Sequence, residues 1–513
     1  MLHQQVHYNV ALWLQQRAKT HGAKTAVVEL DSKRKVSYAE LNEHSSCLAA
    51  GLSRLGLRKG DRLAVLMENR VELLELFYAC SKLGVVFTPL SFRWTSKELS
   101  TTIKHCSPKS LVAEEELLKG KEEALKEVSC VYSLGEGVLG YQSYEELLST
   151  GTGEALAKVN PEDVQTLMYT AGTTGSPKGC LLPYRKTLHN VLNAQLTFGL
   201  NEADVALCTL PLFHSGGLFI QAVPTLCTGG TLLLLRRVRG DPHRLLEALE
   251  KGKATWFLGV AFHAKLLAGL EKAEDTYRLE AMRFWAFGGE AIPYDVVEKL
   301  QVKWPHIALS FCYGTTETSL SIALPPSKRR VSSYLLAKST RRAPAGKPMP
   351  HCEVKISEEG EILVKGPIVF LGYHENPEAT AKAFDEDGWY HTGDLAIMDE
   401  EGYIYVVDRL YNVIKSGGEK ILATEVEEVL LSHPAIADAA VVGVPDEKWG
   451  ERPIAFVVLK PGFEEEPEQL KAFCASRLAK FKVPDKIIFV EELPRAGPDK
   501  VARGGLRKLV LGD

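Results

Sequence analysis

The chain has 513 residues, of which 45% are hydrophobic and 25% charged, with a formal net charge of −4 and a pI near 6.4. This length predicts more than one domain and a large core, and the composition is typical of globular proteins. The lack of a bulk positive charge argues against nucleic acid or an anionic membrane as the main partner.

Ten cysteines are scattered along the chain, without a CxxC pair or a Cys/His cluster at metal-binding spacing. This usage favours reduced, mostly buried thiols in a cytoplasmic protein. The first residues lack the charged start and the apolar stretch of a secretory signal.

The first part of the chain alternates between helical and strand patterns. Apolar residues at helical spacing predict a helix over 37–56, with Ser37 as its N-cap, and another helix over 71–84. Short apolar runs predict strands at 62–67 and 85–90. This alternation indicates parallel sheets covered by helices.

Residues 205–235 contain no Asp, Glu, Lys or Arg. Such a length could suggest a membrane span, but Pro211, Pro224 and two Gly-Gly pairs interrupt it. We therefore expect buried strands and helices, and no integral membrane segment.

The pattern changes near residue 408, where a predicted strand (402–409) is followed by a polar, glycine-containing stretch. The remaining elements suit a small domain of about one hundred residues. They are a helix at 423–436, strands at 439–444 and 453–460, a helix at 467–481 and a strand at 486–493. We expect an N-terminal domain over 1–408, a C-terminal domain over 412–513 and a hinge at 408–412.

The stretch "YTAGTTGSPKG", residues 169–179, offers backbone amides, hydroxyls and one ammonium group. Glycines allow successive N–H groups to converge on an anion, so the loop could hold a polyphosphate. An exposed turn rich in Gly and Pro is the alternative. No Gly-Lys-Ser/Thr triplet occurs, so this is not the loop of P-loop NTPases.

Six further motifs follow the loop in order: "PLFH" (211–214), "FGGEAIP" (287–293), "YGTTE" (313–317), "GWYHTGD" (388–394), "DRLYNVIKSGGEKI" (408–421) and "LPRAGPDK" (493–500). Together they resemble the adenylate-forming superfamily, and specifically its acyl-CoA synthetases. The resemblance implies an α/β fold with a large N-terminal domain of helix-covered, mostly parallel sheets plus a distorted barrel, and a small mobile α+β domain. It also implies two steps, in which ATP and a carboxylate give acyl-AMP and pyrophosphate, and CoA then displaces AMP.

The resemblance assigns the nucleotide to residues of four motifs and the hinge strand. These are Thr170, Gly172, Thr173, Thr174, Gly175, Lys178, Gly289, Glu290, Ala291, Tyr313, Gly314, Thr315, Asp394 and Arg409. Thr316 would donate to the α-phosphate, and Glu317, with Thr174, would hold Mg²⁺. Lys500 would be the catalytic lysine of adenylation, a mobile charge suited to the developing oxyanion. Taken singly, each residue also has a purely structural interpretation, such as a turn or a half-buried side chain.

By the same resemblance, His214 would border the acyl pocket and act in catalysis. The acyl and CoA pockets would be lined by Phe213, Ser215, Gly216, Val260, Ala261, Phe262, Gly288, Ser416, Gly417 and Gly418. These residue types predict an apolar pocket, and no Lys or Arg stands out as a partner for a second carboxylate. A plain fatty or aryl acid is therefore the expected substrate, and a histidine of the core is the alternative for His214.

Three positions depart from the family's usual pattern. Ala171 replaces a serine of the loop, Asp499 replaces the glycine before the lysine, and Tyr411 stands where the hinge usually has Asp or Lys. A hinge requires tolerant backbone torsions more than a given side chain, so rotation remains compatible with Tyr411.

A carboxylate–CoA ligase acting on small molecules, which could form a homodimer, is thus the leading hypothesis. An enzyme that delivers the acyl group from acyl-AMP to a carrier protein is the nearest alternative, and a luciferase-like oxygenase shares the same motifs. A protein that is not an enzyme, namely a sensor of nucleotides or acyl-CoA, is the remaining alternative. Asp499 and Tyr411 alone favour it.

Overall fold

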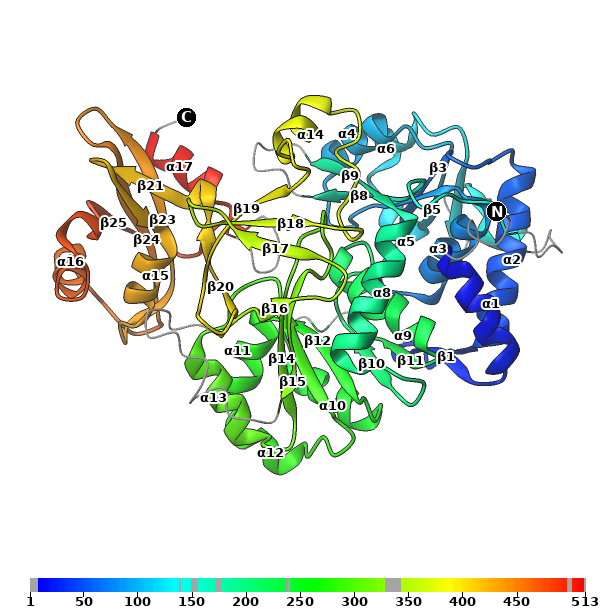
Figure 1. Ribbon diagram of the computed structural model, residues 1–513, viewed down its shortest axis with the longest axis horizontal. Coiled ribbons are helices and arrows are strands. Elements are labelled where there is room, and N and C mark those ends of the chain that lie inside the picture. The colour runs from blue at the N-terminus through cyan, green and yellow to red at the C-terminus, as the bar shows by residue number, and fades with distance from the viewer. Residues whose placement is uncertain are drawn as a thin grey trace. The chain divides into compact units, whose positions relative to one another are not determined.

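A computed structural model describes residues 8–135, 137, 140–148, 156–170, 177–236, 238, 240–327, 343–495 and 501–511. The chain divides into two compact units (Figure 1). Unit 1 consists of Met1–Val354 and Val364–Tyr390, and unit 2 of Lys355–Leu363 and His391–Asp513. The predicted fold class, helix-covered and mostly parallel sheets with a separate C-terminal domain, is confirmed.

Unit 1 contains two large sheets. The nine-stranded sheet runs in the order β16 (Lys347–Pro348), β15 (Ile322–Ser327), β14 (Ala308–Tyr313), β13 (Phe284–Gly288), β12 (Trp256–Val260), β10 (Val205–Cys208), β11 (Thr231–Leu234), β1 (Thr25–Glu29) and β2 (Lys35–Ser37). The seven-stranded sheet runs in the order β7 (Gln142–Ser143), β6 (Val131–Leu134), β5 (Ser110–Glu114), β3 (Arg62–Leu66), β4 (Val86–Pro89), β8 (Val164–Thr170) and β9 (Lys178–Pro183). Their central strands pair in parallel, as the alternating pattern predicts.

The helices of unit 1 are α1 (Val10–Thr20), α2 (Tyr38–Arg54), α3 (Val71–Leu83), α4 (Ser96–Cys106), α5 (Glu115–Leu118), α6 (Glu122–Leu125), α7 (Tyr144–Leu148), α8 (Tyr184–Phe198), α9 (Val223–Thr228), α10 (Pro242–Lys251), α11 (Ala261–Gly269), α12 (Ala273–Thr276), α13 (Tyr294–Lys303) and α14 (Pro377–Ala383). Ser37 caps α2 as predicted, and Glu40 completes a capping box by accepting a hydrogen bond from the Ser37 N–H. Helix α8 contacts both β9 and β15, and so joins the two sheets (Figure 1).

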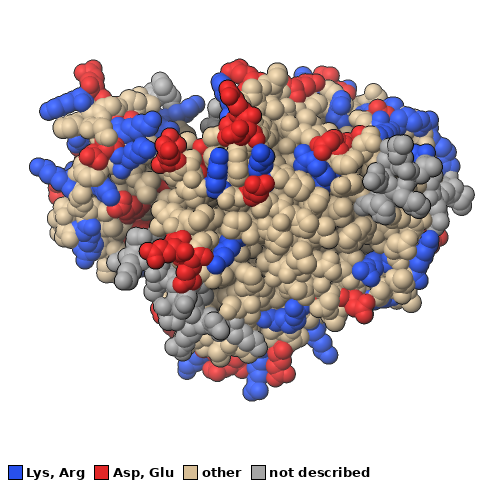
Figure 2. All heavy atoms as spheres, viewed as in Figure 1, with Lys and Arg blue, Asp and Glu red and all other residues tan. Residues whose placement is uncertain are grey.

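The uncharged stretch 205–235 is folded into the core of unit 1. It forms β10, a π-helix over Gly216–Ala222, helix α9 and β11, and most of its apolar side chains are buried. No helix within the described ranges is long and apolar enough to cross a membrane. In Figure 2, Lys and Arg residues are mixed with Asp and Glu residues on the surface, in keeping with the nearly equal numbers of basic and acidic residues in the sequence.

Unit 2 holds most of a four-stranded sheet of β17 (Glu353–Ile356), β18 (Glu361–Lys365), β19 (Tyr390–Met398) and β20 (Ile404–Arg409). Its five-stranded sheet consists of β21 (Val413–Ser416), β22 (Glu419–Leu422), β23 (Ile436–Asp446), β24 (Gly450–Leu459) and β25 (Lys486–Phe489), packed with α15 (Ala423–Leu431), α16 (Pro467–Ala475) and α17 (Arg503–Leu511). The predicted hinge at 408–412 lies inside unit 2. A hinge is a property of motion, and this one stays a prediction.

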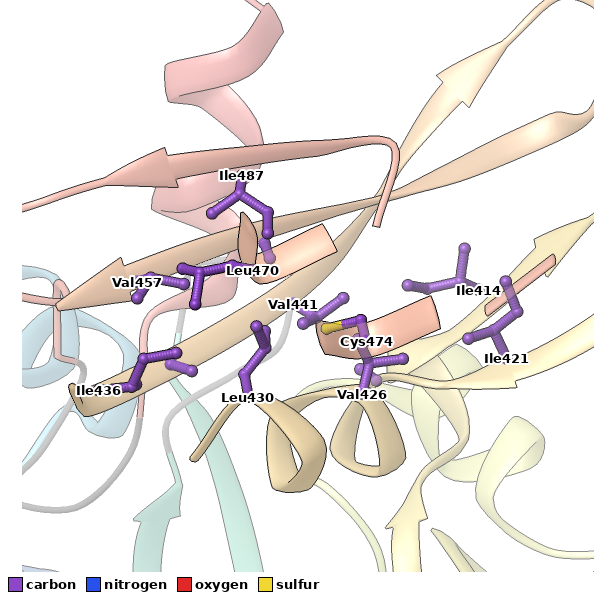
Figure 3. Packing of buried hydrophobic residues seen from close by; sticks show 13 residues of the cluster. Ile414, Ile421, Val426, Leu430, Ile436, Val441, Val457, Leu470, Cys474 and Ile487 are labelled. Carbon is purple, nitrogen blue, oxygen red and sulfur yellow. The ribbon is translucent and has the colours of Figure 1, made fainter. Parts of the chain in front are cut away.

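The core of unit 2 explains where its elements end. Side chains from α15, α16 and all five strands point into one apolar cluster (Figure 3). Helix α16 ends at Ala475, several residues before the predicted end, because Leu478 and Val483 turn back to pack against this cluster. Strand β23 is longer than its predicted apolar run because it pairs with β24 along almost its whole length.

Leu430 and Leu431 offer a direct test of this packing, since they are neighbours on α15 but are 0% and 44% exposed. We expect Leu430→Ala to lower the free energy of unfolding of unit 2 by about 3 kcal/mol through the cavity it creates. Leu431→Ala should change it by less than about 0.5 kcal/mol. Native-state hydrogen exchange of unit 2 measures both values. Equal effects of the two substitutions would contradict the assigned core.

Candidate active site

Four parallel strands of the nine-stranded sheet end at the same edge. Strands β10, β12, β13 and β14 are paired in parallel, with Val260 opposite Gly288 and Phe287 opposite Phe311. Two predicted motifs, 287–293 and 313–317, and the predicted acyl-pocket residues 260–262 begin at or just beyond these carboxyl ends. The segment that leads to His214 follows β10 at the same edge. Ligands of open α/β sheets bind at such an edge.

The segment after β14 is a tightly folded loop. A side chain on Gly314 would collide with the Ser319 carbonyl, because a Cβ atom there would lie 1.5 Å from its oxygen. Thr315 and Thr318 each accept a hydrogen bond from the other's backbone N–H, at 3.3 and 3.1 Å. Ser319 itself adopts a positive φ of 50°. These contacts fix the backbone on both sides of Thr316 and Glu317.

Glu317 is buried and held by neighbours from another segment of unit 1. Its Oε1 accepts a hydrogen bond from the Tyr373 hydroxyl at 2.9 Å, and its carbonyl accepts one from the Phe370 N–H at 2.8 Å. The Tyr373 ring also lies 5.0 Å from the ammonium nitrogen of Lys178. Tyr373 therefore links Glu317 to the base of the predicted phosphate loop.

The predicted phosphate loop itself falls largely outside the described residues. Gly172, Thr173, Thr174 and Gly175 belong to the part that the structure does not describe. Its two ends are described: Thr170 and Lys178 are partners across the β8–β9 hairpin. The loop is therefore the connection of an antiparallel hairpin at the edge of the seven-stranded sheet.

Aromatic rings and small residues surround the predicted acyl pocket. The Phe213 ring is buried between Phe92 and His214, with centroid distances of 5.2 and 4.2 Å. Ser215 is buried, and Gly216 opens the π-helix, a local geometry frequent at functional sites. Val260 is half-buried and Ala261 is buried, whereas Phe262 is 38% exposed.

His214 is accessible to solvent, yet its surroundings disfavour a charge. Desolvation by the protein around it lowers its pKa to about 4, and the charge of Arg93 contributes in the same direction. The imidazole is therefore neutral at pH 7. A neutral ring suits the border of a pocket for an apolar acyl group.

The remaining nucleotide residues of unit 1 differ in exposure. Gly289 and Glu290 are exposed, Ala291 and Tyr313 are half-buried, and Gly288 is buried at the end of β13. Exposed groups beside a half-buried ring are compatible with an adenine-binding edge.

Asp394 and Arg409 come together within unit 2. They are directly opposite each other on β19 and β20, and the Arg409 Nε lies 2.9 Å from the Asp394 Oδ1. Asp394 is buried whereas Arg409 is more exposed. An ionised carboxylate oriented by a guanidinium is an arrangement that can accept hydrogen bonds from ribose hydroxyls.

Residues 416–418 form the turn between β21 and β22. Ser416 pairs with Glu419, and the two glycines between them have φ values of 60° and 86°. This two-residue hairpin turn requires positive φ at both central positions, which explains Gly417 and Gly418. Ser416 is buried and both glycines are exposed.

Lys500, Asp499 and Ala171 lie outside the described residues. The predicted hinge is described: Asp408 accepts hydrogen bonds from the side chains of Asn412 and Thr424, both at 3.0 Å, and Tyr411 is exposed.

Sequence reasoning missed Tyr373, Ser319 and Lys186. Lys186 is fully buried in the first turn of α8 and donates a hydrogen bond to Ser319 Oγ. Desolvation lowers its pKa to about 7, against the opposing effects of Cys180 and Glu317. The buried positions of α8, which include Lys186, Asn190 and Ala194, follow helical spacing. This periodicity could have predicted that Lys186 lies on the buried face of the helix.

Comparisons with known proteins show the family of the chain. The sequence profile of the AMP-binding enzyme family matches residues 14–374, and the profile of the AMP-binding enzyme C-terminal domain matches residues 425–500. The chain belongs to this family. It is an adenylate-forming carboxylate–CoA ligase, as its motifs predict.

Curated relatives match the ligase over nearly its whole length. It is 36% identical over 511 residues to a 2-succinylbenzoate–CoA ligase of Geobacillus sp. (strain WCH70), with 97% of each chain covered. A 2-succinylbenzoate–CoA ligase of Bacillus cereus (strain ATCC 14579) is 35% identical, with 97% of this chain and 98% of that protein covered.

Solved structures share the fold of the ligase. ATP-bound MatB from Rhodopseudomonas palustris superposes with a TM-score of 0.87 at 29% identity, over 98% of both chains. The o-succinylbenzoate CoA synthetase of Bacillus subtilis, in complex with its acyl-adenylate intermediate, has a TM-score of 0.83 at 32% identity, over 96% of this chain and 97% of that one.

Tyr373→Phe tests the link between Glu317 and the loop. We expect the rate of acyl-AMP formation to fall about 10-fold, because a buried carboxylate loses one hydrogen bond. Pyrophosphate release in single-turnover experiments measures this rate. Tyr277→Phe, which removes an exposed hydroxyl, is the control. Indistinguishable rates of the two variants would show that Tyr373 does not orient Glu317.

Proposed function

We propose that the ligase converts an aromatic carboxylic acid, with ATP, Mg²⁺ and CoA, into its CoA thioester, AMP and pyrophosphate. The observation that supports an aromatic acid is the match, at 35–37% identity over 97% of the chain, to relatives named 2-succinylbenzoate–CoA ligases. Of the fatty and aryl acids that the sequence left open, this match favours the aryl acid.

In the first step, an oxygen of the substrate carboxylate attacks the α-phosphorus of ATP. A bond forms between these atoms, the bond from the α-phosphorus to the bridging oxygen breaks, and pyrophosphate leaves. Both reactants are negative, so catalysis depends on positioning and on positive charge. We assign the phosphates to Lys178 and the described ends of its loop, the α-phosphate to Thr316, and the ribose to Asp394 and Arg409.

Glu317 fits the role of a Mg²⁺ ligand. It is a buried carboxylate oriented by Tyr373, and oxygen donors are what Mg²⁺ prefers. Within the described ranges no three His, Cys, Asp or Glu side chains form a metal site, and Mg²⁺ commonly uses one or two carboxylates with substrate phosphates. When bound, the ion would neutralise phosphate charge. A relative from Bacillus subtilis has been solved with ATP and a magnesium ion.

In the second step, the CoA sulfur attacks the acyl carbon, loses its proton, and AMP leaves with the oxygen that joined it to the acyl group. We assign the pantetheine path to the turn at 416–418 and the acyl border to His214, whose neutral ring adds no charge there. Lys500 would supply positive charge in the first step only, with rotation about residues 408–412 between the steps.

We also propose a cytoplasmic location, because all ten cysteines are free thiols and most are buried. The homodimer stays a prediction.

AMP and pyrophosphate release across fatty, aryl and dicarboxylic acids, each with and without CoA, tests the proposed function. We expect AMP formation that depends on CoA and is fastest with an aryl acid. AMP release without CoA would favour transfer to a carrier protein. No turnover with retained ATP binding would favour the sensor.

Lys500→Ala separates the two steps. We expect acyl-AMP formation to fall about 100-fold or more, because a cation at the developing charge is lost. Conversion of supplied acyl-AMP and CoA to thioester should stay within about 3-fold of the unmodified chain. Lys508→Ala, an exposed lysine on α17, is the control. An equal loss in both steps would contradict the assignment.

A further inference from the structure

The segment that leads to the predicted acyl pocket has an irregular backbone. Residues 209–214 connect β10 to the π-helix and include His214, the predicted border of the pocket. Because this connection lies outside the strands, side chains from elsewhere in unit 1 must bind its buried backbone groups. Two buried asparagines, Asn69 and Asn190, bind the two ends of the acyl-pocket segment, residues 210–219.

Asn69 binds the first end of this segment. It is 4% exposed and lies between β3 and α3. Its Nδ2 donates a hydrogen bond to the Leu210 carbonyl, and its Oδ1 accepts one from the Leu212 N–H, both at 2.9 Å. A primary amide offers a donor and an acceptor side by side, so Asn69 takes the place of a neighbouring strand. Its partners are 141 and 143 residues away in sequence.

The connection that carries Asn69 is itself held in place. The Glu68 N–H donates a hydrogen bond to Glu114 Oε1 at 2.7 Å. Arg70 pairs with Glu72 at 2.6 Å and with Glu114 at 3.3 Å. The three carboxylates are buried, so these contacts are little screened by salt. Asn69 is therefore a fixed point to which the acyl-pocket segment is attached.

Asn190, on α8, binds the other end, and a proline explains why its contact is needed. In the π-helix, the Val223 N–H bonds to the carbonyl five residues earlier. By the same spacing the Phe219 carbonyl would pair with residue 224, but Pro224 has no N–H. Asn190, which is 0% exposed, donates its Nδ2 hydrogen bond to this carbonyl. Its Oδ1 accepts a hydrogen bond from the Leu320 N–H at 3.1 Å.

We propose that Asn69 and Asn190 are positioning residues that hold the border of the acyl pocket in place for the acid. This inference rests on the proposed function, because it takes His214 and its neighbours as that border. The two residues differ in what they bind. Both hydrogen bonds of Asn69 go to the acyl-pocket segment, whereas Asn190 also binds Leu320, just beyond the loop of Glu317. Asn69 therefore serves the acid alone, and Asn190 serves both the acid and ATP.

Asn9 shows the purely structural use of the same side chain. It is 0% exposed, its Nδ2 donates to the Ser81 carbonyl at 2.7 Å, and its Oδ1 accepts from the Ala11 N–H at 3.0 Å. These partners belong to α3 and α1, and not to the acyl-pocket segment. Asn9 is thus a matched control that makes the same two kinds of hydrogen bond as Asn69.

The experiment measures the KM for ATP and the KM for the aryl acid that the unmodified chain uses fastest. For Asn69→Ala, we expect the KM for the acid to rise about 10-fold or more, because the pocket border loses two hydrogen bonds and shifts. Its KM for ATP should change less than about 3-fold. Asn190→Ala should raise both KM values. Asn9→Ala should lower the unfolding temperature and leave both KM values within about 3-fold.

Two features keep this experiment decisive where a variant is unstable. A KM value does not depend on the amount of active enzyme, so partial unfolding does not imitate the expected result. If Asn69→Ala does not fold, Asn69→Asp takes its place. The ionised carboxylate retains an acceptor for the Leu212 N–H but has no donor for the Leu210 carbonyl, and should also raise the KM for the acid.

Three results bear against these assignments. A folded Asn69 variant with an unchanged KM for the acid, or with an equal rise in both KM values, would overturn the role of Asn69. An unchanged KM for the acid in Asn190→Ala would overturn the role of Asn190. Both outcomes leave the proposed function intact, whereas an unmodified chain that turns over no aryl acid would refute the proposed function itself.

Discussion

The parallel pairing of β10, β12, β13 and β14 is the constraint on which the site of unit 1 depends. Parallel strands all end at the same edge, so segments more than one hundred residues apart in sequence are brought to one place. The segment proposed to border the acyl pocket follows β10, the segment proposed to line the adenine follows β13, and the loop with Glu317 follows β14. The side chains of each strand are mostly buried, and this burial fixes the register of the strand. The register in turn fixes where the polar segment after the strand begins.

Helix α8 connects this edge to the second sheet of unit 1. It follows β9, whose first residue is Lys178, and it also contacts β15 just beyond the Glu317 loop. The same region holds two polar links, one from Lys178 through Tyr373 to Glu317 and one from Lys186 through Ser319 to Ser215. The first link is partly buried and the second is buried, and low polarity strengthens each electrostatic interaction there.

Unit 2 shows which features local sequence predicts well. The elements predicted from residue 402 onward have the correct type, because alternating and helical apolar patterns are local properties, whereas β21, β22 and α17 were not predicted. The ends of the predicted elements were less accurate: α16 is shorter because Leu478 turns back to the core, and β23 is longer because β24 pairs beyond its apolar run. The ion pair of Asp394 with Arg409 follows from strand register, although both residues had already been assigned to one ligand.

The sequence by itself determined the family, the order of the motifs and the alternation of strands and helices, since each is written in local residue types and spacing. The tertiary structure alone brought Tyr373 to Glu317 and Lys186 to Ser319. In sequence, Lys186 is an ordinary lysine in a helix. Helical spacing could place Lys186 on the buried face of α8, but its contact with Ser319 arises from packing against a segment more than 100 residues away. Such long-range packing is what sequence periodicity cannot encode.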